Sequence, residues 1–301
     1  MDGWIIIDKP VGIGSTQVVS AVKRVLRQGG YGKHKVGHGG TLDPLASGVL
    51  PIAIGEATKL SGRMLDADKA YDFTISFGAE TDTLDAEGKV IATSEARPTR
   101  DQVLGVLSRF TGPIDQVPPA FSALKVEGAR AYDLARAGEE VVLKSRAVTI
   151  HSFDLVDWTS DSATLSVRVS KGTYIRSLAR DVAYALDTVG HVTMLTRTKA
   201  GPFTLESAIS LDKLNQVAMG HPLEELLLPL TAGLDDIPAL AVSLDQARAL
   251  REGRKLIGAA KHQGLHLAIS GNVPVALVEV SSPEIRVVRG FNIAMSKEEN
   301  E

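Results

Sequence analysis

The chain of 301 residues is predicted to adopt an α+β fold. Segments with the alternating pattern of half-buried strands and segments with the 3.6-residue pattern of amphipathic helices both occur in it. These segments follow one another without the regular strand–helix–strand spacing of a parallel sheet. Hydrophobic residues make up 44% of the chain and charged residues 23%, which is ordinary for a globular protein that buries a core in about two domains.

The first elements are a strand and a helix. Residues 4–7 form a short apolar run typical of a buried strand, and Ser15 or Thr16 is predicted to cap a helix. The glycines at 12 and 14 lack the spacing and the lysine of a phosphate-binding loop, so we interpret them as a turn. The apolar stripe of the helix comprises Val18, Val19, Val22, Val25 and Leu26.

Later segments repeat both patterns. Strict alternation over 71–77 indicates a half-buried strand, residues 165–169 repeat it, and a helix is predicted over 175–186. A domain boundary is predicted at residues 235–238. A helix over 244–250 and a strand over 275–280 are expected to build a small separate module.

Composition excludes several classes of function. With no cysteine, the chain has no disulfide, thiolate metal site or cysteine nucleophile. The seven histidines show no metal-ligand spacing. The apolar run near the N-terminus is too short for a signal peptide or a membrane span, so a cytoplasmic protein is expected.

Charge points to local rather than global attraction of polyanions. The net charge is −3, yet no acid occurs between Asp8 and Asp43, a stretch that holds six cations and two histidines. A second acid-free stretch lies between Asp161 and Asp181. Each stretch either faces nucleic acid or carries solvated charges whose acidic partners come from elsewhere in the fold. The six cations are Lys9, Lys23, Arg24, Arg27, Lys33 and Lys35.

Composition also leaves individual candidates undecided. Asp43 precedes a proline, and an Asp-Pro pair is first of all a turn former. Tyr71 by itself is typical of a strand core. Arg176 by itself is typical of an exposed helix.

A longer pattern identifies these residues as a set. Residues 38–50, His-Gly-Gly-Thr-Leu-Asp-Pro-Leu-Ala-Ser-Gly-Val-Leu, closely resemble the catalytic motif of the bacterial tRNA pseudouridine-55 synthases, the TruB family. The resemblance covers roughly residues 4–203. Phe121 and Thr196 depart from the residues common in the family. The motif is joined in order by segments 8–12, 69–71, 81–88, 118–128 and 172–176.

The resemblance assigns roles by position. It implies Asp43 as the catalytic carboxylate, Arg176 as the cation paired with it, and Tyr71 as the tyrosine that stacks on the target base. His38 resembles the histidine that enters the RNA loop, Leu195 an apolar pocket wall, and Tyr174 a further RNA contact. The acid-free loop adds Lys33 and Lys35 as RNA-binding candidates, and Asp85 is a weaker one. Lys9 and Pro10 are expected to brace the floor of the site.

The resemblance also implies the architecture. It predicts a mixed, mainly antiparallel central sheet flanked by helices over residues 1–235, with a thumb insertion at about 118–146. A small β-rich PUA-like RNA-binding domain is expected over 236–301. The implied partner is the T-loop and T-arm of transfer RNA, without a metal, an organic cofactor, a membrane or an obligatory protein partner. The alternative is a protein that binds or folds tRNA and in which catalysis is incidental or lost.

Overall fold

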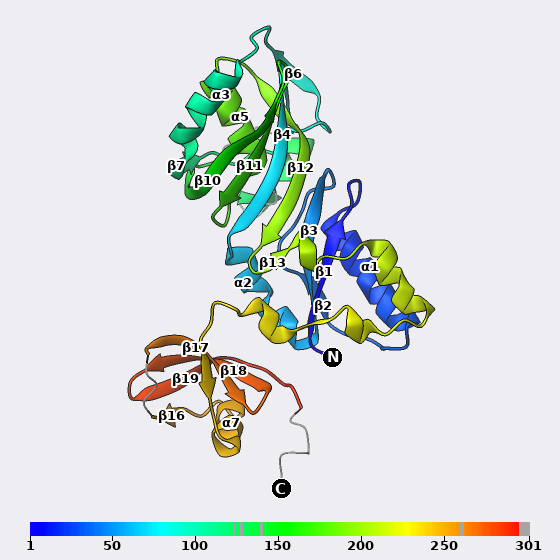
Figure 1. Cartoon of the computed structure of the whole chain (residues 1–301), viewed down its shortest axis with the longest axis vertical. Coiled ribbons are helices and arrows are strands. Elements are labelled where there is room, and N and C mark those ends of the chain that lie inside the picture. Colours follow the sequence, from blue (N-terminus) through cyan, green and yellow to red (C-terminus); the bar gives the residue numbers. More distant parts are fainter. Residues whose placement is uncertain (123, 127–128, 139–140, 142, 259–261, 295–301) are drawn as a thin grey trace.

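The computed structural model describes residues 1–122, 124–126, 129–138, 141, 143–258 and 262–294. A ten-stranded sheet forms its larger part (Figure 1). Among the described strand pairs of this sheet, β3 and β12 alone run parallel, which confirms the prediction of a mixed, mainly antiparallel sheet. From edge to edge the strands are β14 (Leu228–Pro229), β1 (Gly3–Lys9), β3 (Ala46–Ile54), β12 (Gly190–Ala200), β4 (Lys69–Phe77), β11 (Ser162–Val169), β10 (Arg146–Trp158) and β7 (Gly112–Gln116), with β2 (Val36–His38) beside β3 and β13 (Phe203–Thr204) beside β12.

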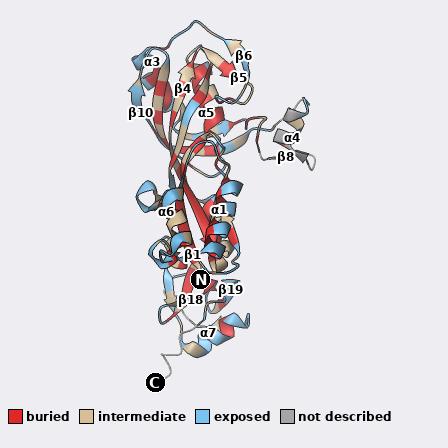
Figure 2. Ribbon diagram, turned by 90° about the vertical axis from the view of Figure 1, so that its right-hand side faces the viewer, coloured by how far each residue is buried: buried red, intermediate tan, exposed pale blue. Residues whose placement is uncertain are grey.

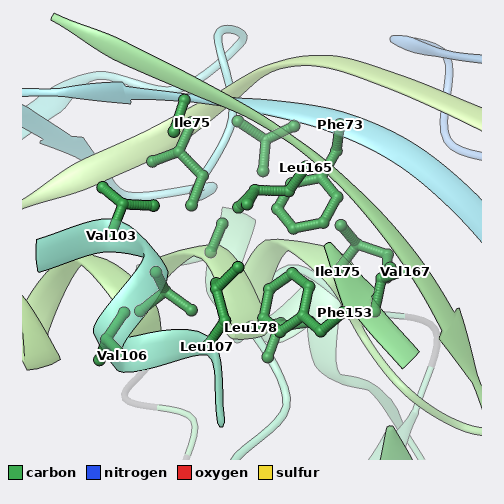
Figure 3. Close-up of a cluster of buried hydrophobic side chains, with 14 of the residues drawn as sticks. Phe73, Ile75, Val103, Val106, Leu107, Phe153, Leu165, Val167, Ile175 and Leu178 are labelled. Atoms are coloured by element: carbon green, nitrogen blue, oxygen red, sulfur yellow. The ribbon is translucent and has the colours of Figure 1, made fainter. Parts of the chain in front are cut away.

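Two helices pack on the half of the sheet formed by β4, β10, β11 and β12. They are α3 (Arg100–Leu107) and α5 (Ile175–Ala185). Figure 3 shows Phe73 and Leu165 of the strands meeting Leu107 and Leu178 of these helices in one apolar cluster. The strands predicted over 71–77 and 165–169 and the helix predicted over 175–186 are therefore confirmed.

The other half of the sheet packs against α1 (Ser15–Gln28). The predicted apolar stripe of this helix is buried, but the predicted cap is wrong, because Gly14 occupies the N-cap position. The Ser15 hydroxyl is used elsewhere: it accepts a bond from the Leu42 amide (2.8 Å) and donates to the Leu42 carbonyl (3.1 Å). A tertiary contact thus takes the side chain that local pattern assigns to capping.

Shorter elements complete this part of the chain. The segment predicted as a thumb contains α4 (Ala131–Arg136), which projects from the body in Figure 2. Positions 123, 127, 128, 139, 140 and 142 of that segment lie outside the described residues. The remaining elements are η1 (Gly55–Leu60), α2 (Ser61–Asp66), β5 (Ala79–Thr81), β6 (Val90–Thr93), η2 (Ser108–Phe110), β8 (Lys125–Val126), β9 (Ala129–Arg130), η3 (Leu205–Ser207), α6 (Leu211–Asn215), η4 (Gln216–Met219), η5 (Leu223–Glu225) and η6 (Leu230–Gly233).

A second sheet follows residue 238 and lies at one end of the molecule (Figure 1). With α7 (Leu244–Arg251) it encloses its own apolar cluster, so the predicted helix and strand are confirmed as elements. We call residues 239–290 the C-terminal module. The strand order is β15 (Ala239–Ala241), β17 (Gly264–Ser270), β18 (Val273–Ser281), β19 (Glu284–Gly290) and β16 (Leu256–Ile257).

The C-terminal part of the chain packs on the main sheet. Leu267, Leu277 and Phe291 share an apolar cluster with Trp4 and Phe203. In the described part of the chain, no helix has the length and apolarity needed to cross a membrane.

Candidate active site

The candidate site lies where the two halves of the main sheet meet. Here β3 and β12 pair in parallel, with Leu195 opposite Ala46 and Arg197 opposite Gly48. Gly48 has a φ of +99°, and a Cβ there would lie 2.2 Å from the Arg197 carbonyl oxygen. Only glycine therefore allows this approach, which places the loop before β3 over the end of β12.

That loop carries Asp43, and buried side chains hold it from below. The Ser15 hydroxyl bonds both backbone groups of Leu42, as described above. Lys9 is fully buried, and its Nζ donates to three carbonyls, those of Pro10 (2.9 Å), Ile13 (2.7 Å) and Pro44 (3.4 Å). The residues on either side of Asp43 are thus fixed, as expected for Lys9. Burial lowers the pKa of Lys9, and Asp43 opposes that shift.

Arg197 is a third support of the loop. It is 1% exposed and donates to the carbonyls of Gly40 (3.1 Å), Thr41 (3.4 Å) and Val49 (2.8 Å). Burial lowers the pKa of His38, and the positive charge of Arg197 lowers it further. The imidazole of His38 is therefore neutral near pH 7.

Arg176 joins two carboxylates. Its Nη2 lies 2.9 Å from Asp43 Oδ2, and its Nη1 lies 3.5 Å from Asp85 Oδ2. The guanidinium also donates to the carbonyls of Thr83 (2.9 Å) and Phe121 (3.0 Å). The side chains of Arg176 and Asp85 are 8% exposed, whereas that of Asp43 is 44% exposed. Asp43 is thus the member of this set that solvent or a substrate reaches.

Asp85 is held by its own loop. Its Oδ1 accepts bonds from the Thr83 hydroxyl (2.6 Å) and the Glu87 amide (3.1 Å). Leu84 adopts a left-handed conformation (φ 63°), which turns the chain tightly before Asp85. The loop therefore presents a fixed anion to Arg176.

Asp43, Asp85 and Arg176 line a small pocket. One side is polar, formed by Asp43, Asp85 and Arg176. The other side is mainly apolar and includes Val192, Met194 and Leu195. The pocket therefore places a carboxylate that is paired with a cation opposite an apolar surface.

The other predicted site residues lie around the pocket rather than in its lining. Tyr71 is half-buried on β4, next to Arg197 of β12, and like Leu195 it packs against both large apolar clusters. His38 is partly buried on β2. Tyr174 is the N-cap residue of α5, with the Arg146 guanidinium 4.7 Å from its ring centroid. Lys33 and Lys35 are exposed.

Sequence reasoning missed Gln116. This fully buried side chain accepts a bond from the Tyr174 amide (2.8 Å) and donates to the Tyr174 carbonyl (3.1 Å), two residues before Arg176. The side chains of Ser15 and Arg197 were also missed as supports of the loop. Residue type gave no signal for any of them, because each contact joins distant parts of the chain. The described residues contain no group of three or more side chains suited to hold a metal.

Comparison with protein families gives two matches. The family described as "TruB family pseudouridylate synthase (N terminal domain)" matches residues 24–175. The family described as "tRNA pseudouridylate synthase B C-terminal domain" matches residues 176–235.

Individual proteins agree. The chain is 65% identical over 298 residues to a tRNA pseudouridine synthase B of Novosphingobium aromaticivorans, covering 97% of this chain and 98% of the relative. It is 61% identical over 292 residues to one of Zymomonas mobilis, covering 97% and 96%.

Solved structures share the fold. An H/ACA RNP bound to a substrate RNA containing 2'-deoxyuridine includes a chain that matches with a TM-score of 0.74 and 24% identity, over 96% of this chain and 84% of that one. An archaeal box H/ACA sRNP Nop10-Cbf5 complex matches with a TM-score of 0.72 and 23% identity, over 96% and 85%.

Proposed function

The chain belongs to the TruB family of pseudouridylate synthases, and on this premise we propose that it converts uridine 55 in the T-loop of transfer RNAs to pseudouridine, with Asp43 as the catalytic carboxylate. Its relatives are named tRNA pseudouridine synthase B, so the protein is an isomerase that modifies tRNA. The observation that carries the assignment of Asp43 is its ion pair with Arg176 at the mouth of the pocket.

The reaction is an isomerisation. The bond from uracil N1 to the sugar C1′ breaks, the base turns, and C5 bonds to C1′. C5 then loses its proton and N1 gains one, so nothing is oxidised or reduced. The uridine must first leave the stacked loop to reach a pocket, at a cost of a few kcal/mol.

Asp43 has two routes open to it. Its carboxylate either attacks the sugar or the base and forms a covalent adduct, or removes a proton from C2′ so that the base departs by elimination. Its 44% exposure supports either role, since among the described residues the oxygen not paired with Arg176 has no hydrogen-bond partner. Deuterium at C2′ separates the routes, because only proton removal from C2′ gives a primary isotope effect.

Arg176 fixes the direction of the Asp43 carboxylate. The guanidinium is anchored by Asp85 and two carbonyls, so it holds Asp43 in one orientation. In this proposal Asp85 acts through Arg176 and is a positioning residue. The family often has tyrosine at position 121, but Arg176 contacts the backbone carbonyl of Phe121, which either residue supplies.

The remaining candidates are assigned to RNA. Tyr71 stacks on the uracil, a contact worth about 1–3 kcal/mol, and Leu195 forms an apolar wall. His38 enters the loop beside the displaced base, where a neutral imidazole stacks without a charge to desolvate. Tyr174 contacts nearby nucleotides.

Charge and the C-terminal module extend the RNA contact in this proposal. Lys33 and Lys35 are exposed cations that meet phosphates. Residues 1–235 form the catalytic domain, with a thumb insertion at about 118–146. Residues 236–301 form a PUA-like RNA-binding domain.

The test is Asp43→Asn. Asparagine keeps the shape of the side chain but neither forms the covalent adduct nor takes a proton, so pseudouridine formation should fall by at least about 10²- to 10⁴-fold. Affinity for tRNA should stay within a few-fold, because phosphate contacts and stacking remain. The measurement is tritium release from tRNA labelled at uridine C5, with the modified position mapped and a filter-binding titration run in parallel.

Asp157→Asn is the matched control, an exposed acid on β10 away from the pocket that should keep full activity. An Asp43→Asn protein with more than about a tenth of the wild-type rate would exclude Asp43 as the catalytic carboxylate. A wild-type protein that binds tRNA but forms no pseudouridine would favour the RNA-binding and folding alternative.

A further inference from the structure

The cations of the two acid-free stretches differ in whether they form salt bridges in the structure. In the second stretch, Lys171 pairs with Asp66 (3.0 Å), Arg176 with the site carboxylates, and Arg180 with Asp181 (2.8 Å). There the cations have acidic partners from the fold. The first stretch differs, because in the described part of the chain its exposed cations form no salt bridge: Lys23, Arg24, Arg27, Lys33 and Lys35.

Four of the basic side chains of that stretch line one groove. Lys23 and Arg27 stand one helical turn apart on α1, and Lys33 and His34 come from the loop that follows. The groove has a volume of roughly 400 Å³ and also includes Leu26 and Gly32. The loop after α1 contacts one acid among the described residues: Glu224 accepts a hydrogen bond from the Tyr31 hydroxyl (3.0 Å). The groove is therefore a local positive surface on a protein whose net charge is −3.

The groove is connected to the active site but separate from it. Helix α1 begins at Ser15, whose hydroxyl holds Leu42 beside Asp43. Lys23 and Arg27 follow Ser15 by eight and twelve residues. At 1.5 Å per residue they lie about 12–18 Å farther along the helix axis, too far to touch the nucleotide that Asp43 contacts.

We propose that this groove binds the phosphodiester backbone of the substrate RNA at a second position, away from the target uridine. The inference rests on the proposed function for the identity of the RNA. Unpaired lysine and arginine at one-turn spacing suit phosphates, which accept charge-assisted hydrogen bonds and release counterions when neutralised. The groove then fixes the register of the RNA while the pocket reads the target base.

The test uses the full chain with Lys23→Ala and Arg27→Ala combined. Binding of an unmodified tRNA transcript is measured over a range of salt concentrations. Loss of two phosphate contacts should weaken binding several-fold at low salt and reduce the slope of log K against log salt by about 1.4–1.8. The rate at saturating enzyme should not change. The control combines Arg100→Ala with Arg109→Ala. Both residues are exposed, and they lie on α3 and η2, at the other half of the sheet.

Phosphate ethylation interference then locates the contact. Ethylation of a phosphate that the groove contacts should impair binding of the wild-type protein but not of the groove variant. We expect these phosphates to lie away from the target uridine and not to flank it. An unchanged slope, or interference lost only at the target nucleotide, would overturn the proposal. The readout is binding, so it stays informative if pseudouridine mapping fails. A failure of the proposed function is seen separately, as absence of pseudouridine from tRNA treated with the wild-type protein.

Discussion

At the scale of single residues, buried cations organise the floor of the site. Lys9, Lys69 and Arg197 are each less than 9% exposed, and all three donate to backbone carbonyls. They therefore fix the loop and strand ends beneath Asp43 and Tyr71. Buried charge is costly unless it is well paired, and the hydrogen bonds to these carbonyls offset that cost while they define the backbone position.

The cost of burying the charge of Lys69 can be measured as a dependence of stability on pH. Burial, followed by the charge of Arg197, lowers the pKa of Lys69 to about 8 from 10.5. Between these two pH values the unfolded chain binds more protons than the folded one, so the contribution of Lys69 makes stability rise with pH across this window. Lys9 shifts in the same direction, whereas Tyr184, with a pKa raised to about 12, opposes the rise above pH 10.

We therefore expect the melting temperature of Lys69→Met to rise less between pH 7.5 and 9.5 than that of the wild type. The variant should be less stable at every pH, because the carbonyls of Leu65 and Ala67 lose their donor. Lys199→Met, on a residue exposed on β12, is the control and should keep the wild-type pH dependence. Equal slopes for Lys69→Met and wild type would show that Lys69 titrates normally.

At the scale of elements, the hydrophobic periodicity of the sequence predicted strands and helices but not the tertiary contacts between them. The strand over 71–77 and the helix over 175–186 were predictable, because one face of each is apolar at the period of its backbone. Asp43 and Arg176 were predicted as site residues from the resemblance to the TruB family. The contact of Gln116 with Tyr174 was not predictable, because an isolated glutamine at the end of a short strand has no sequence signature.

That contact ties β7 to the start of α5. Helix α5 has no side-chain cap at Tyr174, so Gln116 fixes the residue from which Arg176 extends. The chain just after Gln116 is also held, because Arg180 donates to the Val117 carbonyl (3.2 Å) and Arg176 to that of Phe121. The base of the predicted thumb and the arginine of the site are therefore mechanically linked.

Gln116→Met should thus lower kcat as well as stability. Methionine fills the space but leaves two partly buried backbone groups of Tyr174 without their partner, at up to about 1–3 kcal/mol each. Ile150→Val is the control, since it removes one methyl group from the neighbouring strand β10 at a cost of about 0.5–1.5 kcal/mol and keeps the hydrogen bonds of Gln116 to Tyr174. Single-turnover rates are compared at a temperature where both variants are folded. Equal rates would show that Gln116 contributes to stability alone.

At the scale of the whole molecule, the active site and the C-terminal module are distinct but not independent. Every residue assigned to the pocket precedes residue 196. Yet the module shares an apolar cluster with β1 and β13, and Arg63 pairs with Asp236 (2.8 Å) across the junction. The sequence places a predicted boundary at residues 235–238, but it did not predict the shared apolar surface, which only the folded arrangement reveals.

Removing the chain after residue 235 should therefore weaken tRNA binding and lower stability while it leaves the catalytic step intact. The truncated protein loses Leu267, Leu277 and Phe291 from the cluster that covers Trp4, and newly exposed apolar side chains cost on the order of 1.5–3 kcal/mol each. Its melting temperature should fall. Affinity for tRNA should also fall, because the proposed RNA-binding module is gone, while the contacts of Asp43 with Arg176 and of Arg176 with Asp85 stay within the retained chain.

The measurement that separates these effects is a single-turnover rate at saturating enzyme, below the melting temperature of the truncated protein. Under those conditions weak binding is overcome, so the rate should stay within a few-fold of the full chain while the tRNA Kd rises. Leu277→Ala in the full chain is the matched control, since it opens the shared cluster but keeps the surface of the module. If the control loses tRNA affinity as strongly as the truncation, the loss reflects instability rather than missing RNA contacts. If the folded truncation shows no turnover at saturation, the C-terminal module belongs to the active site.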